Sequence, residues 1–170
     1  MTRTLVIGFG NTLRGDDGAG QLAAARIAEL HPDLTCFSLV ELTPELADTM
    51  SVYDRVVFID ASVGIETLRW HVLRPSVERT QPRSHALTPG DLLQLTIELF
   101  NSAPQQVELV EIPASQFGFC EEMSIHTRSM IENFVGLFGE TMDLHAGDVA
   151  YLVSAHVSDS SQSVIPSTAN

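Results

Sequence analysis

The sequence predicts a single doubly wound α/β domain, in which helices cover both faces of a mostly parallel sheet. Three observations support this prediction. The 170 residues are the size of one domain, and strand-like apolar runs alternate with helix-like segments. The run Arg55–Asp60 is apolar without alternation, which is typical of a strand covered on both faces. We therefore expect one domain over residues 1–157 and a loose Ser-rich tail over residues 158–170.

The expected strands are short aliphatic or β-branched runs, and the expected helices begin at a capping residue or a proline. A glycine-rich loop over residues 8–18 joins the first strand to the first helix, and Asp16 or Asp17 is the expected cap of that helix. We expect strands over residues 4–9, 34–40, 55–60, 67–73 and 106–112, with an antiparallel edge position as an option for the fourth. Helices are expected over 19–30, from 43, over 88–100 and over 125–138, whereas the strand-like stretch 149–153 has no clear place.

The chain contains no lysine, because all nine of its basic residues are arginine. A Walker-type phosphate loop, a Schiff-base or pyridoxal enzyme and a lysine general base all need an ε-amino group, so these are excluded. Receiver domains, which combine similar aspartates with a lysine, are excluded as well. A dinucleotide site is disfavoured, because the loop lacks the third glycine and carries Asp16 and Asp17 where a pyrophosphate would approach. The Gly-x-Ser-x-Gly elbow of serine hydrolases is absent.

The formal net charge is −13, and the half from residue 84 onward holds only Arg128 among its basic residues. A chain without a basic stripe is a poor partner for nucleic acids or anionic membrane surfaces. No apolar run reaches the length of a membrane span, and the start does not resemble a signal peptide. We expect a cytoplasmic monomer. Cys36 and Cys120 match no paired metal motif, and both are expected to be buried thiols.

Candidate chemical groups follow three strands of the predicted sheet. Asp16 and Asp17 come after the first strand, Asp60 ends the third and His85 follows the fourth. Ligands of doubly wound sheets bind beyond the carboxyl ends of the strands, so these groups are expected at one edge. Two carboxylates and an imidazole suit a divalent transition metal. Each residue alone has a simpler explanation, namely a helix cap, a solvated strand end or an exposed loop, but their conjunction favours a site.

The opening loop, Gly8-x-Gly10-Asn11-x-Leu13-x-x-Asp16-Asp17-Gly18-x-Gly20, resembles the signature of the hydrogenase maturation endopeptidases. The resemblance continues in Phe58-Ile59-Asp60-Ala61 and in Ser84-His85-x-Leu87, which precedes a leucine-rich helix. The stretch Glu111-Ile112-Pro113 with Phe117-Gly118 is similar to a further segment of that family. Together these motifs span residues 4–138.

The resemblance implies a peptidase that removes a C-terminal peptide from the large-subunit precursor of a nickel–iron hydrogenase after nickel insertion. The nickel would arrive with the substrate and contact Asp17, Asp60 and His85, with another divalent metal as an alternative occupant in its absence. Asp16, Asp17 and Asp60 are the expected catalytic residues, and Asp16 is a candidate base. The nickel could assist hydrolysis or only dock the precursor. The alternative function is a non-catalytic, metal-binding regulatory module.

Overall fold

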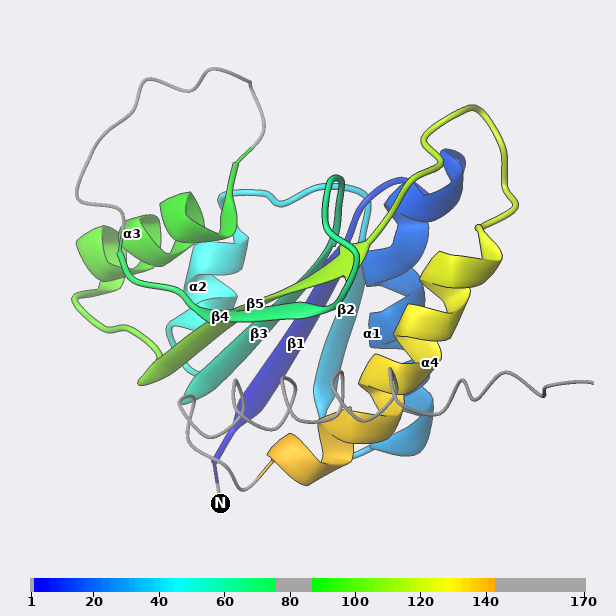
Figure 1. Cartoon of the computed structure of the whole chain (residues 1–170). Helices are drawn as coiled ribbons and strands as arrows, with labels where there is room; N and C mark the ends of the chain where they lie inside the picture. Colours follow the sequence, from blue (N-terminus) through cyan, green and yellow to red (C-terminus); the bar gives the residue numbers. More distant parts are fainter. Residues whose placement is uncertain (1, 76–86, 143–170) are drawn as a thin grey trace, which may run out of the picture.

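Five strands form one sheet in the order β2-β1-β3-β5-β4 in the computed structural model, which describes residues 2–75 and 87–142 (Figure 1). The pairs between neighbours are parallel except for the last, where β4 runs antiparallel to β5 at the sheet edge. The predicted mostly parallel sheet is therefore confirmed, and so is the antiparallel edge strand. The strands are β1 (Thr4–Phe9), β2 (Thr35–Leu39), β3 (Arg55–Ser62), β4 (Arg69–Val72) and β5 (Gln106–Pro113).

Helices cover both faces of this sheet, as the sequence predicts. The helices α1 (Ala19–Leu30) and α4 (Ile125–Phe138) lie on one face, and α2 (Leu46–Met50) and α3 (Pro89–Phe100) lie on the other (Figure 1). Within the described residues, no helix has the length and apolar character needed to cross a membrane.

The start of α1 differs from the prediction. A short 3-10 helix, η1 (Gly15–Gly18), precedes α1, and the N-cap of α1 is Gly18, without a side-chain hydrogen bond. The prediction that Asp16 or Asp17 caps α1 is therefore wrong, because η1 carries both carboxylates one turn ahead of the helix. Both side chains are left for other contacts.

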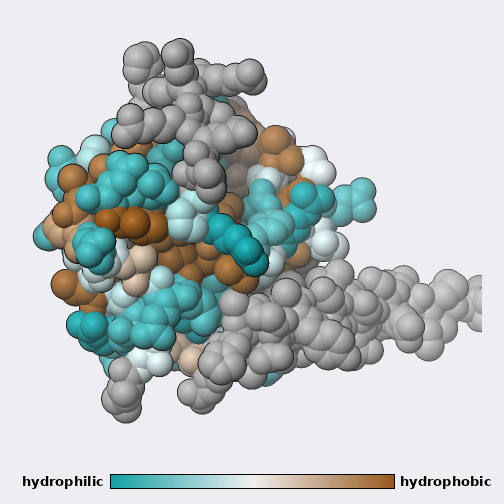
Figure 2. Space-filling view, turned by 90° about the vertical axis from the view of Figure 1, so that its left-hand side faces the viewer, coloured by the Kyte–Doolittle hydropathy of each residue, from teal (hydrophilic) through white to brown (hydrophobic). Residues whose placement is uncertain are grey.

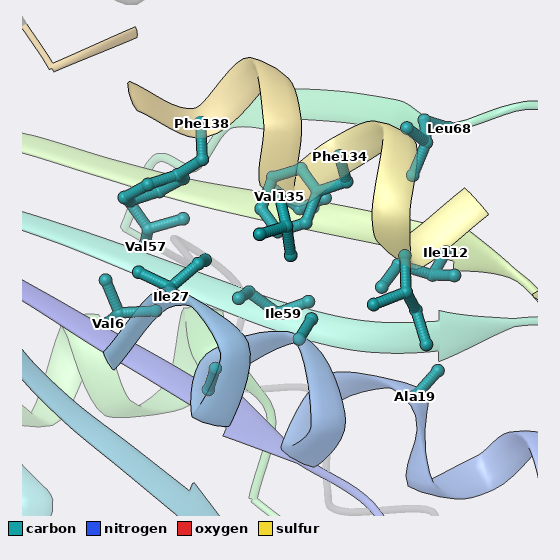
Figure 3. Packing of buried hydrophobic residues seen from close by; sticks show 14 of the residues in the cluster. Val6, Ala19, Ile27, Val57, Ile59, Leu68, Ile112, Phe134, Val135 and Phe138 are labelled. Carbon is teal, nitrogen blue, oxygen red and sulfur yellow. The ribbon is translucent and has the colours of Figure 1, made fainter. Parts of the chain in front are cut away.

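A separate hydrophobic core fills the space on each side of the sheet. On the α1 and α4 side, Figure 3 shows Ile27 of α1, Val57 of β3 and Phe138 of α4 gathered over the sheet. Trp70 of the edge strand joins this core, with its ring 5.5 Å from that of Phe134 in an edge-to-face arrangement. The other core is built by β1, β3 and β5 with α2 and α3. Its buried members are Leu5, Ile7, Leu42, Leu46, Met50, Val56, Phe58, Leu92, Leu93 and Val107.

Glycines allow the start of α1 to approach the sheet closely. A Cβ on Gly20 would lie 2.3 Å from the carbonyl oxygen of Ile59 and 2.5 Å from that of Phe9. A Cβ on Gly8 would lie 1.9 Å from the carbonyl oxygen of Gly20. No side chain fits between these backbones, so the two glycines bring η1 down onto the ends of β1 and β3.

The point where the strand order reverses lies between β1 and β3. From β1 the chain crosses through α1 to β2 on one side, and it returns through α2 to β3 on the other side. In doubly wound sheets, such a point opens a crevice beyond the carboxyl ends of the two strands. The loop that bears Asp17 follows β1, and Asp60 lies near the end of β3, so both predicted carboxylates lie at this position.

The two cysteines lie in different environments. Cys36 is half-buried, and burial, assisted by the charge of Asp33, raises the pKa of its thiol to about 11. Cys120 is exposed, so the prediction that both cysteines are buried thiols is wrong. The domain limit at residue 157, the stretch 149–153 and the tail 158–170 all lie outside the described residues.

Candidate active site

Asp17 is positioned by the glycine-rich loop between β1 and η1. Gly10 adopts a φ of 130°, and a Cβ there would lie 1.9 Å from the carbonyl oxygen of Asp17, so the loop can close only with glycine at this position. The backbone N–H of Asn11 donates to Oδ2 of Asp17 at 3.1 Å. The Asp17 side chain is half-buried. Its other oxygen, Oδ1, accepts no hydrogen bond from the described residues and is the natural candidate to meet a ligand.

Asp60 lies two residues before the end of β3 and is half-buried. Its Oδ1 accepts a hydrogen bond from the backbone N–H of Ala61 at 2.8 Å. Burial, together with the negative charges of Asp17 and Glu111, raises the pKa of Asp60 to about 6, against the effect of that hydrogen bond. Asp17 and Asp60 therefore lie close enough to repel each other, as expected for two carboxylates that share one site.

Glu111 is a third carboxylate at this edge, and the sequence did not predict it as a site residue. It pairs with Asp60 across β3 and β5, which places both side chains on the same face of the sheet. Its Oε1 accepts from Oγ of Ser62 at 2.8 Å, and its Oε2 lies 2.7 Å from Nε2 of His71 on the edge strand. These two contacts fix Glu111 beside Asp60. The signal available in the sequence was the rule that singled out Asp60, namely an acidic residue near the end of a buried strand.

Asp16, the predicted base, points to a different place from Asp17. It is fully buried, and its carboxylate contacts the segment between β5 and α4. Oδ2 accepts from the backbone N–H groups of Ser115 and Gln116, at 2.9 and 3.0 Å, and from Oγ of Ser124 at 2.9 Å. Oδ1 accepts from the backbone N–H of Ser124 at 2.7 Å.

These contacts decide the charge state of Asp16. Burial raises the pKa of its carboxyl, but the hydrogen bonds from Ser115, Ser124 and Gln116 outweigh burial and hold the pKa below its ordinary value. A carboxylate that is held as an anion with both oxygens occupied is poorly suited to accept a proton from water. The geometry therefore favours a structural role for Asp16, and its role as the base stays an untested prediction.

The Asp16→Asn variant is expected to lose about 2 kcal/mol of unfolding free energy at neutral pH, because four donors, three backbone N–H groups and one hydroxyl, lose a charged acceptor. Urea denaturation measures this difference. Because the folded pKa of Asp16 is lowered, its contribution is present at neutral pH and is lost as the pH falls through that folded pKa, so the two proteins should converge in acid. The exposed Asp33→Asn variant is the control. Equal stability of Asp16→Asn and the natural protein at pH 7 would contradict this role.

The predicted metal ligands are only partly placed by the structure. Asp17 and Asp60 come together as expected, whereas His85 lies outside the described residues. Over residues 2–75 and 87–142, no three His, Cys, Asp or Glu side chains are grouped so that they could hold a metal ion. The two aspartates supply oxygen donors for a divalent cation, and a further ligand has to come from elsewhere in the chain or from the cation's carrier.

Solved structures of other proteins share this fold. The NiFe hydrogenase maturation protease HycI from Thermococcus kodakarensis is 27% identical to this chain, with a TM-score of 0.64. The match covers 82% of this chain and 91% of that one. This chain belongs to the family of NiFe hydrogenase maturation proteases. The predicted family and the prediction of a peptidase are thereby confirmed.

Further maturation proteases share the fold at lower identity. HybD from Thermococcus kodakarensis is 21% identical, with a TM-score of 0.58, and the match covers 81% of this chain and 97% of that one. The hydrogenase maturating endopeptidase HybD from Escherichia coli is 20% identical, with a TM-score of 0.54, and the match covers 80% of this chain and 89% of that one. No family model and no curated protein matches this maturation protease by sequence.

Proposed function

We propose that this maturation protease removes a C-terminal peptide from the large-subunit precursor of a NiFe hydrogenase, in the cytoplasm, once the precursor carries nickel. Membership of the family supports the peptidase activity, and HycI and HybD are named for hydrogenase maturation. The observation that carries the nickel-dependent part is the convergence of Asp17 and Asp60 at the point where the strand order reverses.

The electrostatics of this pair favour a cation. Burial and the neighbouring carboxylates Asp17 and Glu111 raise the pKa of Asp60 to about 6, so the ionised carboxylates repel one another at neutral pH. A divalent cation between Asp17 and Asp60 would relieve this repulsion. Carboxylate oxygens together with an imidazole nitrogen form a suitable donor set for nickel, and we propose His85 as the source of that nitrogen.

In this proposal the nickel belongs to the substrate, and the protease recognises the nickel by coordinating it. A precursor without nickel would lose its main anchor and stay uncut, so cleavage would act as a check on metal insertion. Nickel close to the scissile peptide could also polarise its carbonyl group or lower the pKa of a water molecule. Because the oxygens of Asp16 are occupied by hydrogen bonds, we propose Asp60 rather than Asp16 as the group that accepts the proton of that water.

The activity is tested by incubating the purified protease with nickel-loaded precursor and weighing the products by mass spectrometry. We expect the natural protein to release a C-terminal peptide and the His85→Ala variant to release none while keeping its circular dichroism spectrum. His126→Ala, at an exposed position on α4, is the control and should cleave normally. If the natural protein binds nickel but leaves the precursor intact, the non-catalytic metal-binding module is the better description. Full cleavage by His85→Ala would remove His85 from the site.

A further inference from the structure

Large apolar side chains exposed at the carboxyl edge of the sheet include Val40 after β2 and Val63 after β3. Three more lie on the loop after β1 and on the segment from β5 into α4. Phe119, between β5 and α4, is 98% exposed, Ile125 at the start of α4 is 88% exposed, and Leu13, after β1, is 56% exposed. We call these three residues the edge patch. Figure 1 shows the segment from β5 to α4 beyond the ends of the strands, next to the start of α1.

Hydrogen bonds hold the edge patch in place. The buried carboxylate of Asp16 accepts bonds from Ser115, Gln116 and Ser124, which lie on both sides of Phe119 in the sequence. The backbone N–H of Cys120 donates to the carbonyl oxygen of Leu13 at 3.2 Å, so the two loops are joined directly. Phe119 is therefore exposed on a segment that is fixed at both ends. Little conformational entropy would be lost when a partner covers this segment.

Exposed apolar residues also occur elsewhere, but in a different setting. Leu99 and Phe100 are exposed at the end of α3, and Leu30 is exposed at the end of α1. Both helices end at the amino edge of the sheet, because each leads into the start of a strand. Figure 2 shows the side of the molecule on which α3 lies, where apolar and hydrophilic surface alternate. Single exposed apolar residues of this kind are common on protein surfaces. The edge patch differs in two ways. The loops of Leu13 and Phe119 are joined by a hydrogen bond, and the patch lies at the same edge of the sheet as Asp17.

We propose that the edge patch is a docking surface for the protein substrate, through an apolar segment of that substrate close to its metal-bearing region. This inference rests on the proposed function. A protein whose metal meets Asp17 must cover the surrounding edge of the sheet, and Asp16, the neighbour of Asp17 in the chain, holds the loop that presents Phe119. A fixed, exposed aromatic side chain is the kind of residue that dominates binding at protein interfaces.

The charges around the edge patch limit what the docked segment can be. Glu121 and Glu122 follow Phe119 and are exposed, and the chain as a whole carries a net charge of −13. An acidic border disfavours an acidic partner, because like charges across an interface repel. We therefore expect the docked segment to be apolar with neutral or basic neighbours.

The test is the affinity of the Phe119→Ala variant for nickel-loaded precursor, measured by biolayer interferometry, together with its cleavage kinetics. Because Phe119 is exposed, its truncation should leave the fold intact. We expect Kd and KM to rise about tenfold with kcat unchanged. Leu99→Ala is the matched control, since Leu99 is 63% exposed at the other edge, and it should behave as the natural protein.

The remaining outcomes separate this inference from the proposed function. If the natural protein binds the precursor without cleaving it, the proposed activity fails, and the Kd of Phe119→Ala still tests the edge patch. If the natural protein cleaves and Phe119→Ala has the same Kd and KM, the edge patch is not a docking surface. If sedimentation shows that the natural protein is a dimer and Phe119→Ala a monomer, the occupant is a second copy of this chain, and the inference is overturned.

Discussion

The Asp60→Asn variant is expected to lose cleavage of nickel-loaded precursor by roughly 100-fold or more while becoming more stable than the natural protein at pH 7. Cleavage falls because an amide is a far weaker ligand for a metal ion than a carboxylate. Stability rises because the substitution removes a charge that is half-buried and repelled by Asp17 and Glu111. Mass spectrometry of the products and urea denaturation measure the two effects.

The sign of the stability effect follows from the pKa of Asp60. The pKa is raised from 3.8 to about 6 in the folded state, so folding favours the protonated form. Ionising Asp60 in the folded protein costs unfolding free energy. This cost is absent below the unfolded pKa of 3.8, and it grows as the pH rises towards the folded pKa of about 6. With allowance for solvent screening, the variant should gain about 1 to 2 kcal/mol at pH 7 and nothing in acid below the unfolded pKa.

Asp33→Asn is the control, because Asp33 is an exposed aspartate in the turn between α1 and β2. It should retain cleavage and change stability little. Two results would contradict the account of Asp60. One is normal cleavage by Asp60→Asn, and the other is a lower stability of this variant at pH 7 than that of the natural protein.

The Gly20→Ala variant is expected to be destabilised by about 3 kcal/mol or more, which corresponds to a fall in melting temperature of roughly 6 to 12 °C for a domain of this size. The added Cβ would lie 2.3 Å from the carbonyl oxygen of Ile59 and 2.5 Å from that of Phe9. Both obstacles are backbone atoms of the sheet, so α1 has to move away from β1 and β3. Thermal unfolding followed by circular dichroism measures the change.

A second glycine provides the matched control for this prediction. Gly136 lies in α4, and a Cβ there would meet no atom within 4 Å. Alanine has the higher helix propensity, so Gly136→Ala should be as stable as the natural protein or more stable by up to about 1 kcal/mol. A melting temperature of Gly20→Ala equal to that of Gly136→Ala would show that α1 does not depend on this close approach.

Much of the fold could be predicted from the sequence, because its signals are local. The apolar run of β3 and the Thr88-Pro89-Gly90-Asp91 start of α3 each identify an element on their own. In the structure, the side chain of Thr88 accepts from the backbone N–H of Asp91, and Asp91 accepts in return from that of Thr88. The rule that ligand sites lie beyond strand ends then placed Asp17 and Asp60 at one edge.

The remaining features could not be predicted because they depend on contacts between distant parts of the chain. The partners of Asp16 lie 99 to 108 residues further along, so no local pattern distinguishes its role from that of Asp17. The importance of Glu111 follows from its pairing with Asp60 across β3 and β5, and the strand register is set by the whole sheet. The expected cap of α1 was wrong because η1, a 3-10 turn with no distinctive sequence signal, precedes the helix.

In the proposed function, two carboxylates at the point where the strand order reverses coordinate a metal carried by the substrate. The most direct test of this proposal is to offer the natural protein nickel-loaded and nickel-free precursor in parallel and to weigh the products over time by mass spectrometry. We expect release of a C-terminal peptide from the loaded precursor and an intact chain from the nickel-free one. Cleavage of both precursors at equal rates would contradict the proposal.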